Sequence, residues 1–87
     1  MINAVIVTVK MEGSRRKHDM ELPADIPLSE LASKLLMALK KIEKSLFMGV
    51  GNIKIMYNTE NRYLFNLETL ASAGVWDGSI ITVERVM

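Results

Sequence analysis

The sequence predicts an α+β domain in which a mixed sheet of four to five strands packs on one main helix. Three observations support this fold class. β-Branched residues fill short segments near both ends of the chain, apolar residues recur at helical spacing in residues 27–45, and apolar and polar residues alternate in residues 53–57. The expected element order is ββαββ, with a short helical turn before the last strand.

The first two strands are expected to form a hairpin. Residues 4–10 are rich in valine and isoleucine, which favours a strand. In residues 16–22 every second side chain is a candidate for burial: His18, Met20 and Leu22. Gly13 and Ser14 separate the two segments, so the connection is short and contains glycine, as hairpin connections often do.

Residues 27–45 predict the main helix. Their apolar side chains recur three or four positions apart and form one stripe: Leu28, Leu31, Leu35, Leu39 and Ile42. Pro27 can occupy the first helical position, where its missing N–H has no intrahelical partner in any case. Met37 is also a candidate for the core. A helix with a single apolar stripe is expected to cover one face of one sheet.

The remaining strands follow the helix, which is expected to end near Gly49 and Gly51. Residues 53–57 alternate as a third strand, with isoleucine or tyrosine at every second position, and residues 63–65 are a candidate for a short fourth strand. A helical turn then directs Leu70 into the core, and Asp77-Gly78 makes the last turn before a strand at residues 80–83. The first and last strands are both rich in valine and isoleucine, which favours central positions. This order is typical of a β-grasp, or ubiquitin-like, domain.

Composition narrows the classes of function. At 87 residues the chain is expected to make one domain, residues 1–87, with little room for an internal active site. A net charge of +1 does not favour nucleic-acid binding, and no apolar run reaches the ~18–20 residues needed for direct membrane insertion. The absence of cysteine excludes thiol catalysis and thiolate metal sites. We therefore expect no enzyme, and no catalytic, cofactor-binding or metal-binding residues.

Three features that suggest chemistry have simpler interpretations. His18 is the only histidine, and its neighbour Asp19 is expected on the opposite face of the strand. The sequence places no serine or other carboxylate beside the imidazole, so we assign it no catalytic role. The basic cluster Arg15-Arg16-Lys17 either contacts a phosphate or acidic partner, or forms a solvated hairpin whose charge discourages edge pairing; the second interpretation is favoured. The segment 49–51 (Gly-Val-Gly) lacks the lysine and hydroxyl residues of a phosphate-binding loop and fits a helix exit better.

Alternation in three strands predicts an apolar patch on the sheet face away from the helix. Ile6 and Ile80 alternate with the inward-facing residues of the first and last strands, so they are expected to point away from the helix. Lys54 and Met56 do the same in the third strand. Trp76 either caps one end of the core, which is favoured, or is an exposed anchor for a protein partner. We predict that these five residues bind a partner; the alternative is scattered apolar surface, which is common. Periodicity gives three methionines no clear buried position: Met11, Met48 and Met56.

Two segments carry a resemblance to a known family. Residues 22–36 read LPADIPLSELASKLL and residues 70–83 read LASAGVWDGSIITV, and together they cover about a third of the chain. They resemble the YukD/EsaB family, the small ubiquitin-like proteins of type VII (WXG100, or ESAT-6-type) bacterial secretion systems. They are also similar to the N-terminal cytosolic domain of the multi-spanning EccD component. Because the sequence has no membrane segment, the standalone form is the expected match.

The resemblance implies a non-enzymatic accessory or regulatory protein that acts by binding. Its expected partner is a protein component of the secretion apparatus, or a second copy of the chain in a homodimer. The expected location is cytoplasmic, at the periphery of a membrane secretion complex. The alternative function is a ubiquitin- or sulfur-carrier-like modifier activated at its C-terminus. That alternative is disfavoured because the last glycine is Gly78, so the sequence shows no Gly-Gly tail.

Overall fold

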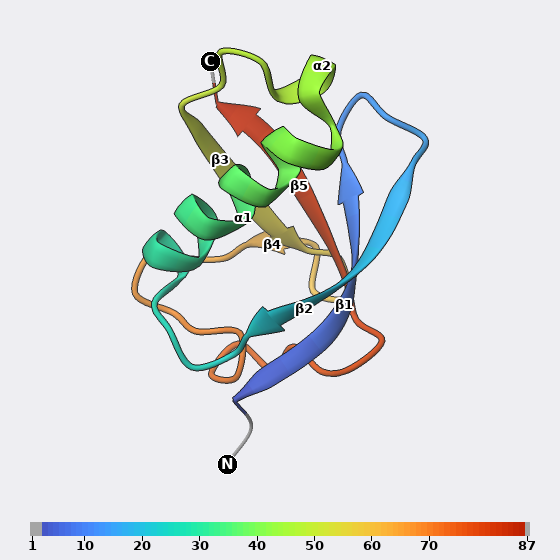
Figure 1. Cartoon of the computed structure of the whole chain (residues 1–87). Helices are drawn as coiled ribbons and strands as arrows, with labels where there is room; N and C mark the ends of the chain where they lie inside the picture. Colours follow the sequence, from blue (N-terminus) through green and yellow to red (C-terminus); the bar gives the residue numbers. More distant parts are fainter. Residues whose placement is uncertain (1–2, 87) are drawn as a thin grey trace.

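The computed structural model describes residues 3–86 and shows two helices and five strands in that range (Figure 1). In chain order these elements are β1 (Ala4–Met11), β2 (Lys17–Pro23), α1 (Leu28–Ile42), α2 (Lys44–Phe47), β3 (Asn52–Tyr57), β4 (Arg62–Tyr63) and β5 (Ile80–Val86). The predicted α+β class with four to five strands and one main helix is therefore confirmed. To the order ββαββ the structure adds a four-residue second helix after the main one and the two-residue strand β4.

The five strands form one mixed sheet in the order β2-β1-β5-β3-β4. β1 pairs with β5 in parallel, with Val9 opposite Ile81, and every other pairing is antiparallel. The predicted central positions of the first and last strands are confirmed, because β1 and β5 are neighbours in the middle of the sheet. This is the β-grasp arrangement expected from the sequence.

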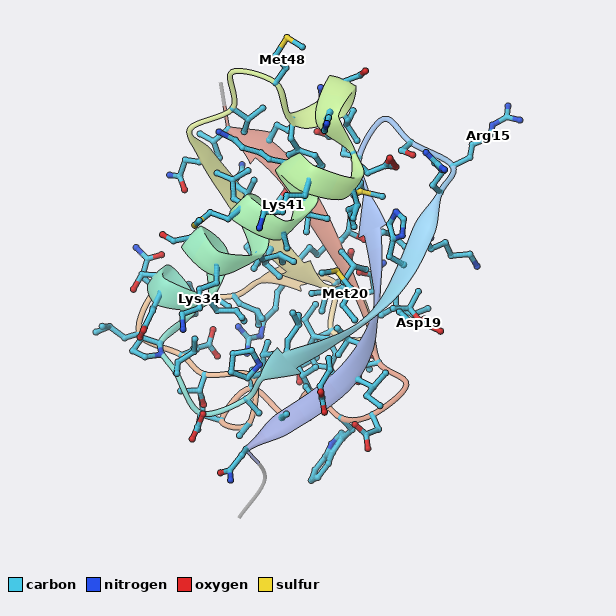
Figure 2. All side chains as sticks on the ribbon, in the orientation of Figure 1. Arg15, Asp19, Met20, Lys34, Lys41 and Met48 are labelled. Atoms are coloured by element: carbon cyan, nitrogen blue, oxygen red, sulfur yellow. The ribbon has the colours of Figure 1, made fainter. Side chains whose placement is uncertain are left out.

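α1 lies across one face of the sheet and buries its apolar stripe there (Figure 1). The buried helix residues are Leu28, Leu31, Leu35, Leu36 and Leu39. The strands contribute the residues that alternation assigned to this face: Val5, Val7, Val9, Ile53, Ile55, Tyr57, Ile81 and Val83. In β2, Met20 packs against the core while Asp19 points away from it (Figure 2). The inward and outward assignments of these strands are therefore confirmed.

The main helix is shorter than predicted. It ends at Ile42 because Glu43 leaves the helical conformation, with φ −133° and ψ 60°, before α2 begins at Lys44. Ile42 consequently lies at the helix end with 46% of its surface exposed, so its predicted place in the core stripe is wrong. Pro27 is the N-cap rather than the first helical residue, and Met37 is 65% exposed on the outer face of α1.

Strand lengths explain three further differences. β1 extends one residue beyond the predicted segment, so Met11 continues the inward alternation and is buried, contrary to the expectation from periodicity. β4 covers Arg62–Tyr63 instead of residues 63–65. β5 continues to Val86, which places Arg85 on the same side of the strand as the buried Val83.

The predicted turn before the last strand is present as one helical turn. The Ala73 N–H donates to the Thr69 carbonyl at 3.0 Å, and the Val75 N–H donates to the Leu70 carbonyl at 3.0 Å. Gly74 ends the turn at φ +81°, a conformation that glycine adopts without a Cβ clash. Leu70 is fully buried as predicted. The Tyr57 hydroxyl donates to the Gly74 carbonyl at 3.0 Å, which attaches this turn to β3.

Candidate partner-binding face

The sheet face opposite α1 carries an oblique row of apolar side chains, here called the open-face diagonal: Ile6, Ile80 and Met56. Thr8 pairs with Ile80, and Thr82 pairs with Met56. Ile6 and Ile80 are therefore diagonal neighbours on one face, and so are Ile80 and Met56. Ile6 is 52% exposed and Ile80 39% exposed, and Met56 is half-buried. The structure thus brings together three of the five residues predicted for this surface.

Hydrogen-bonded polar pairs flank the open-face diagonal. The Thr8 hydroxyl donates to Asp19 Oδ1 at 2.8 Å, and the Thr82 hydroxyl donates to Asn58 Oδ1 at 2.8 Å. These side chains satisfy one another, so a partner that covers the apolar row does not have to break them. An apolar row framed by satisfied polar groups resembles the core and rim of a protein interface.

Lys54, Tyr63 and Glu84 form a charged border beyond Met56. The Tyr63 hydroxyl lies 2.8 and 2.9 Å from the two carboxylate oxygens of Glu84, and this hydrogen bond raises the pKa of Tyr63. The Lys54 ammonium lies 4.8 Å from the centre of the Tyr63 ring, within cation–π range. Sequence reasoning identified Lys54 but missed Tyr63, because β4 was expected to cover residues 63–65 and not Arg62–Tyr63. It missed Glu84 because the last strand was expected to end at residue 83. The pairing of Met56 with Tyr63 is what brings the tyrosine onto this face.

Trp76 lies in a turn that is attached to β1 beside Ile6. The Ser79 N–H donates to the Trp76 carbonyl at 3.0 Å. The Ile6 N–H donates to Asp77 Oδ1 at 2.8 Å, and the Gly78 N–H donates to the Ile6 carbonyl at 2.8 Å. Trp76 is 60% exposed, so the favoured expectation that it caps the core is wrong. It adds a large exposed aromatic residue next to the Ile6 end of the open-face diagonal.

An ion-pair cluster fixes the loop that follows β4. Arg62 donates two parallel hydrogen bonds to Glu68, at 2.9 and 2.8 Å, and the Phe65 N–H donates to the same carboxylate at 2.7 Å. Arg62 also contacts Glu60 at 2.8 Å. The hydrogen bonds from Arg62 hold the pKa of Glu68 at about 2, below its usual value of 4.5. This cluster stabilises the loop and places no ionisable group on the open-face diagonal.

The basic cluster of the first hairpin is divided by the fold. Arg15 extends from the hairpin into solvent (Figure 2), whereas Arg16 Nη1 lies 3.1 Å from Glu43 Oε2. His18 Nε2 lies 3.7 Å from Glu43 Oε1, so a carboxylate does lie near the histidine, although this distance is too long for a hydrogen bond. Glu43 reaches this position from the α1–α2 junction, which sequence spacing could not indicate.

The described residues contain neither a candidate metal site nor a helix that could cross a membrane. Within residues 3–86, no three histidine, aspartate or glutamate side chains gather in a group that could hold a metal ion. In the same range, neither helix has the length and apolar character of a membrane-crossing segment.

Comparison with known proteins supports the resemblance seen in the sequence. The family model described as "WXG100 protein secretion system (Wss), protein YukD" matches residues 5–83. No curated protein sequence matches the chain.

The solved structures that match include ubiquitin-like domains of secretion proteins. The ubiquitin-like domain of the Mycobacterium tuberculosis type VII secretion system protein EccD1 has a TM-score of 0.75 at 23% identity, over 95% of this chain and 99% of that one. The EccD5 ubiquitin-like domain from Mycobacterium xenopi has a TM-score of 0.74 at 18% identity, over 95% and 94%. A chain of the MycP5-free ESX-5 inner membrane complex has a TM-score of 0.76 at 22% identity, but only 21% of that chain is covered, against 98% of this one.

These structural matches establish the ubiquitin-like β-grasp fold. The family-model match covers both segments that carry the sequence resemblance, residues 22–36 and residues 70–83. On that match, the chain belongs to the YukD family of the WXG100 protein secretion system.

Proposed function

We propose that this domain is a non-enzymatic, ubiquitin-like interaction module that serves as an accessory component of a type VII (WXG100) secretion system. It acts by docking its open sheet face onto a protein component of the secretion apparatus. Docking takes place in the cytoplasm, at the periphery of the membrane complex. The observation that carries this proposal is the open-face diagonal, which remains exposed on a sheet whose other face is covered by α1.

The chemistry of the face supports a protein as its partner. Ile6, Ile80 and Trp76 are large and exposed, and tryptophan is among the residue types enriched at the positions that dominate binding energy in protein interfaces. The central strands β1, β5 and β3 hold the diagonal on a rigid surface, so binding requires little ordering of the backbone. Lys54 and Glu84 at the border present both signs of charge, which suits orientation of a protein partner rather than a uniformly charged ligand.

The test compares one substitution on the open face with a matched substitution on the helix. Met56→Asp places a charge in the middle of the diagonal, and Met37→Asp makes the same change on the exposed outer face of α1. The tagged proteins are used to capture partners from cells that contain the secretion system, followed by mass spectrometry. Wild type and Met37→Asp should retain a secretion-system component, and Met56→Asp should lose it while its melting temperature stays nearly unchanged.

Light scattering on the same three proteins tests the second possible occupant, another copy of the chain. If wild type and Met37→Asp are dimers and Met56→Asp is a monomer, the face joins two copies. Equal capture of secretion components by all three proteins would contradict the assignment of the open face. A large loss of stability in Met56→Asp would show that Met56 belongs to the core.

A further inference from the structure

A second candidate site lies on the helix side of the sheet, away from the open-face diagonal. It is a groove of about 630 Å³ between the β1–β2 turn, the α1–α2 junction and the end of β5. Four of its lining side chains are basic and one is acidic: Arg16, Lys41, Lys44, Arg85 and Glu43. The chain as a whole carries a net charge of only +1, so positive charge is concentrated at this groove.

Arg85 is the residue that distinguishes this groove from an ordinary basic surface. It follows the buried Val83 by two residues on β5, so its side chain points toward the helix layer. Arg85 Nη1 donates to the Leu46 carbonyl at 3.3 Å, and Nη2 lies 3.1 Å from where a Cβ on Gly13 would be. The absence of a side chain on Gly13 therefore leaves room for the guanidinium, which is held at a defined position.

The guanidinium of Arg85 has no acidic partner within residues 3–86. No carboxylate in that range lies within 4.0 Å of it, and the nearby Glu43 is instead paired with Arg16. Half-buried arginines usually place their fork of donors against a carboxylate or phosphate. Lysines in the last turn of α1 are explained by the helix dipole, but Arg85 lies on a strand and is not.

We propose that this basic groove binds an acidic peptide segment of a partner protein, with Arg85 receiving a carboxylate. The apolar part of the lining favours a peptide over a free anion, because Ile42 is 46% exposed and Leu46 is half-buried beside the cations. In such a peptide, an aliphatic side chain next to the glutamate or aspartate would cover Ile42 and Leu46. The proposal concerns a surface separate from the open face and does not depend on the function proposed for that face.

Nuclear magnetic resonance on the isotope-labelled full chain tests this proposal. The probe is an N-acetylated, C-amidated pentapeptide of alternating glutamate and leucine, and the control peptide has glutamine in place of glutamate. The glutamate peptide should give saturable shifts at the amides of Gly13, Ser14, Ser45 and Leu46, which decrease as salt is added. The glutamine peptide should give none.

Variants assign the effect to individual cations. Arg85→Gln should weaken binding by about tenfold, as expected for loss of one charge-assisted hydrogen-bonded pair. Lys44→Gln, at an exposed position, should weaken it by about threefold, since a solvated charge contributes less. Lys10→Gln removes an exposed cation from the open face and should leave the affinity unchanged.

Three results would overturn the proposal. The first is an absence of saturable shifts in the groove with the glutamate peptide. The second is equal affinity in wild type, Arg85→Gln and Lys44→Gln. The third is tighter binding of inorganic phosphate or of a short single-stranded oligonucleotide at the same amides, which would make the groove a phosphate site. None of these results bears on capture through the open face, so the two proposals fail independently.

Discussion

Substitution of Asp77 tests how the turn carrying Trp76 is attached to the sheet. The carboxylate of Asp77 accepts the Ile6 N–H at 2.8 Å across 71 positions of sequence. Asp77→Ala removes this acceptor and leaves the Ile6 N–H at a sheet position without its partner. Asp77→Asn keeps an oxygen acceptor but removes its charge, so the two variants separate the hydrogen bond from its charge assistance.

The magnitude follows from the exposure of the bond. A hydrogen bond contributes about 0.5–1.5 kcal/mol net, and this one is solvent-exposed, so Asp77→Ala should cost about 1 kcal/mol. For a domain of this size, that loss corresponds to a fall of roughly 4–8 °C in the melting temperature. Asp77→Asn should cost less than half as much, because an amide oxygen still accepts the bond.

Urea unfolding followed by circular dichroism measures the free energy, and hydrogen exchange at the Ile6 amide reports on the bond itself. Asp25→Ala is the matched control, since Asp25 is exposed and forms no hydrogen bond or ion pair through its side chain within residues 3–86. The expected result is faster exchange at Ile6 in Asp77→Ala only. If Asp77→Ala and Asp25→Ala agree within about 0.3 kcal/mol, the turn is held by other contacts and the reasoning is refuted.

Three further predictions concern the core, the helix end and the ion pair. Leu39→Ala should lower the unfolding free energy measured by calorimetry by about 3 kcal/mol, because its side chain is fully buried. Ile42→Ala should lower it by less than about 1 kcal/mol. Equal losses in the two variants would contradict the observed end of α1. The hydrogen bonds from Arg62 lower the pKa of Glu68 in the folded state, so the ionised carboxylate stabilises the fold at pH values above 4.5. This stabilisation should be lost as the pH falls from 4.5 to about 2. Arg62→Gln should lower the unfolding free energy at pH 7 slightly, since a solvated ion pair contributes little, and should remove most of that decline. An unchanged acid profile would exclude this ion pair as its source.

Sequence periodicity correctly predicted which side chains face the core wherever a helix or strand is long and regular. The alternation of Val5, Val7 and Val9 assigned the inward face of β1 and therefore the outward position of Ile6. The helix stripe was correct up to Leu39 and wrong at Ile42. That error arises because Glu43 leaves the helical conformation while making tertiary contacts with β2 and its preceding turn, which helical spacing does not encode.

The parts that sequence did not predict depend on contacts between distant segments. Tyr63 joins the open face through its pairing with Met56, and the strand containing it has only two residues, too few to give a periodic signal. Arg85 can be recognised as a candidate binding residue only in the folded structure, where the β1–β2 turn and the α1–α2 junction surround it. Trp76 is exposed because its turn lies along β1, and a single aromatic residue beside a glycine turn gives no indication of which side it faces.

The parallel pairing of β1 with β5 has a mechanical consequence. Pairing runs from Thr8 opposite Ile80 to Met11 opposite Val83, while β1 starts at Ala4 and β5 ends at Val86. Tension applied at those two strand ends therefore acts along the strands in opposite directions. The hydrogen bonds between β1 and β5 run across that direction and are loaded together in shear instead of opening one after another. The domain should resist stretching between its terminal strands far better than a pull that peels β4 from the edge of the sheet.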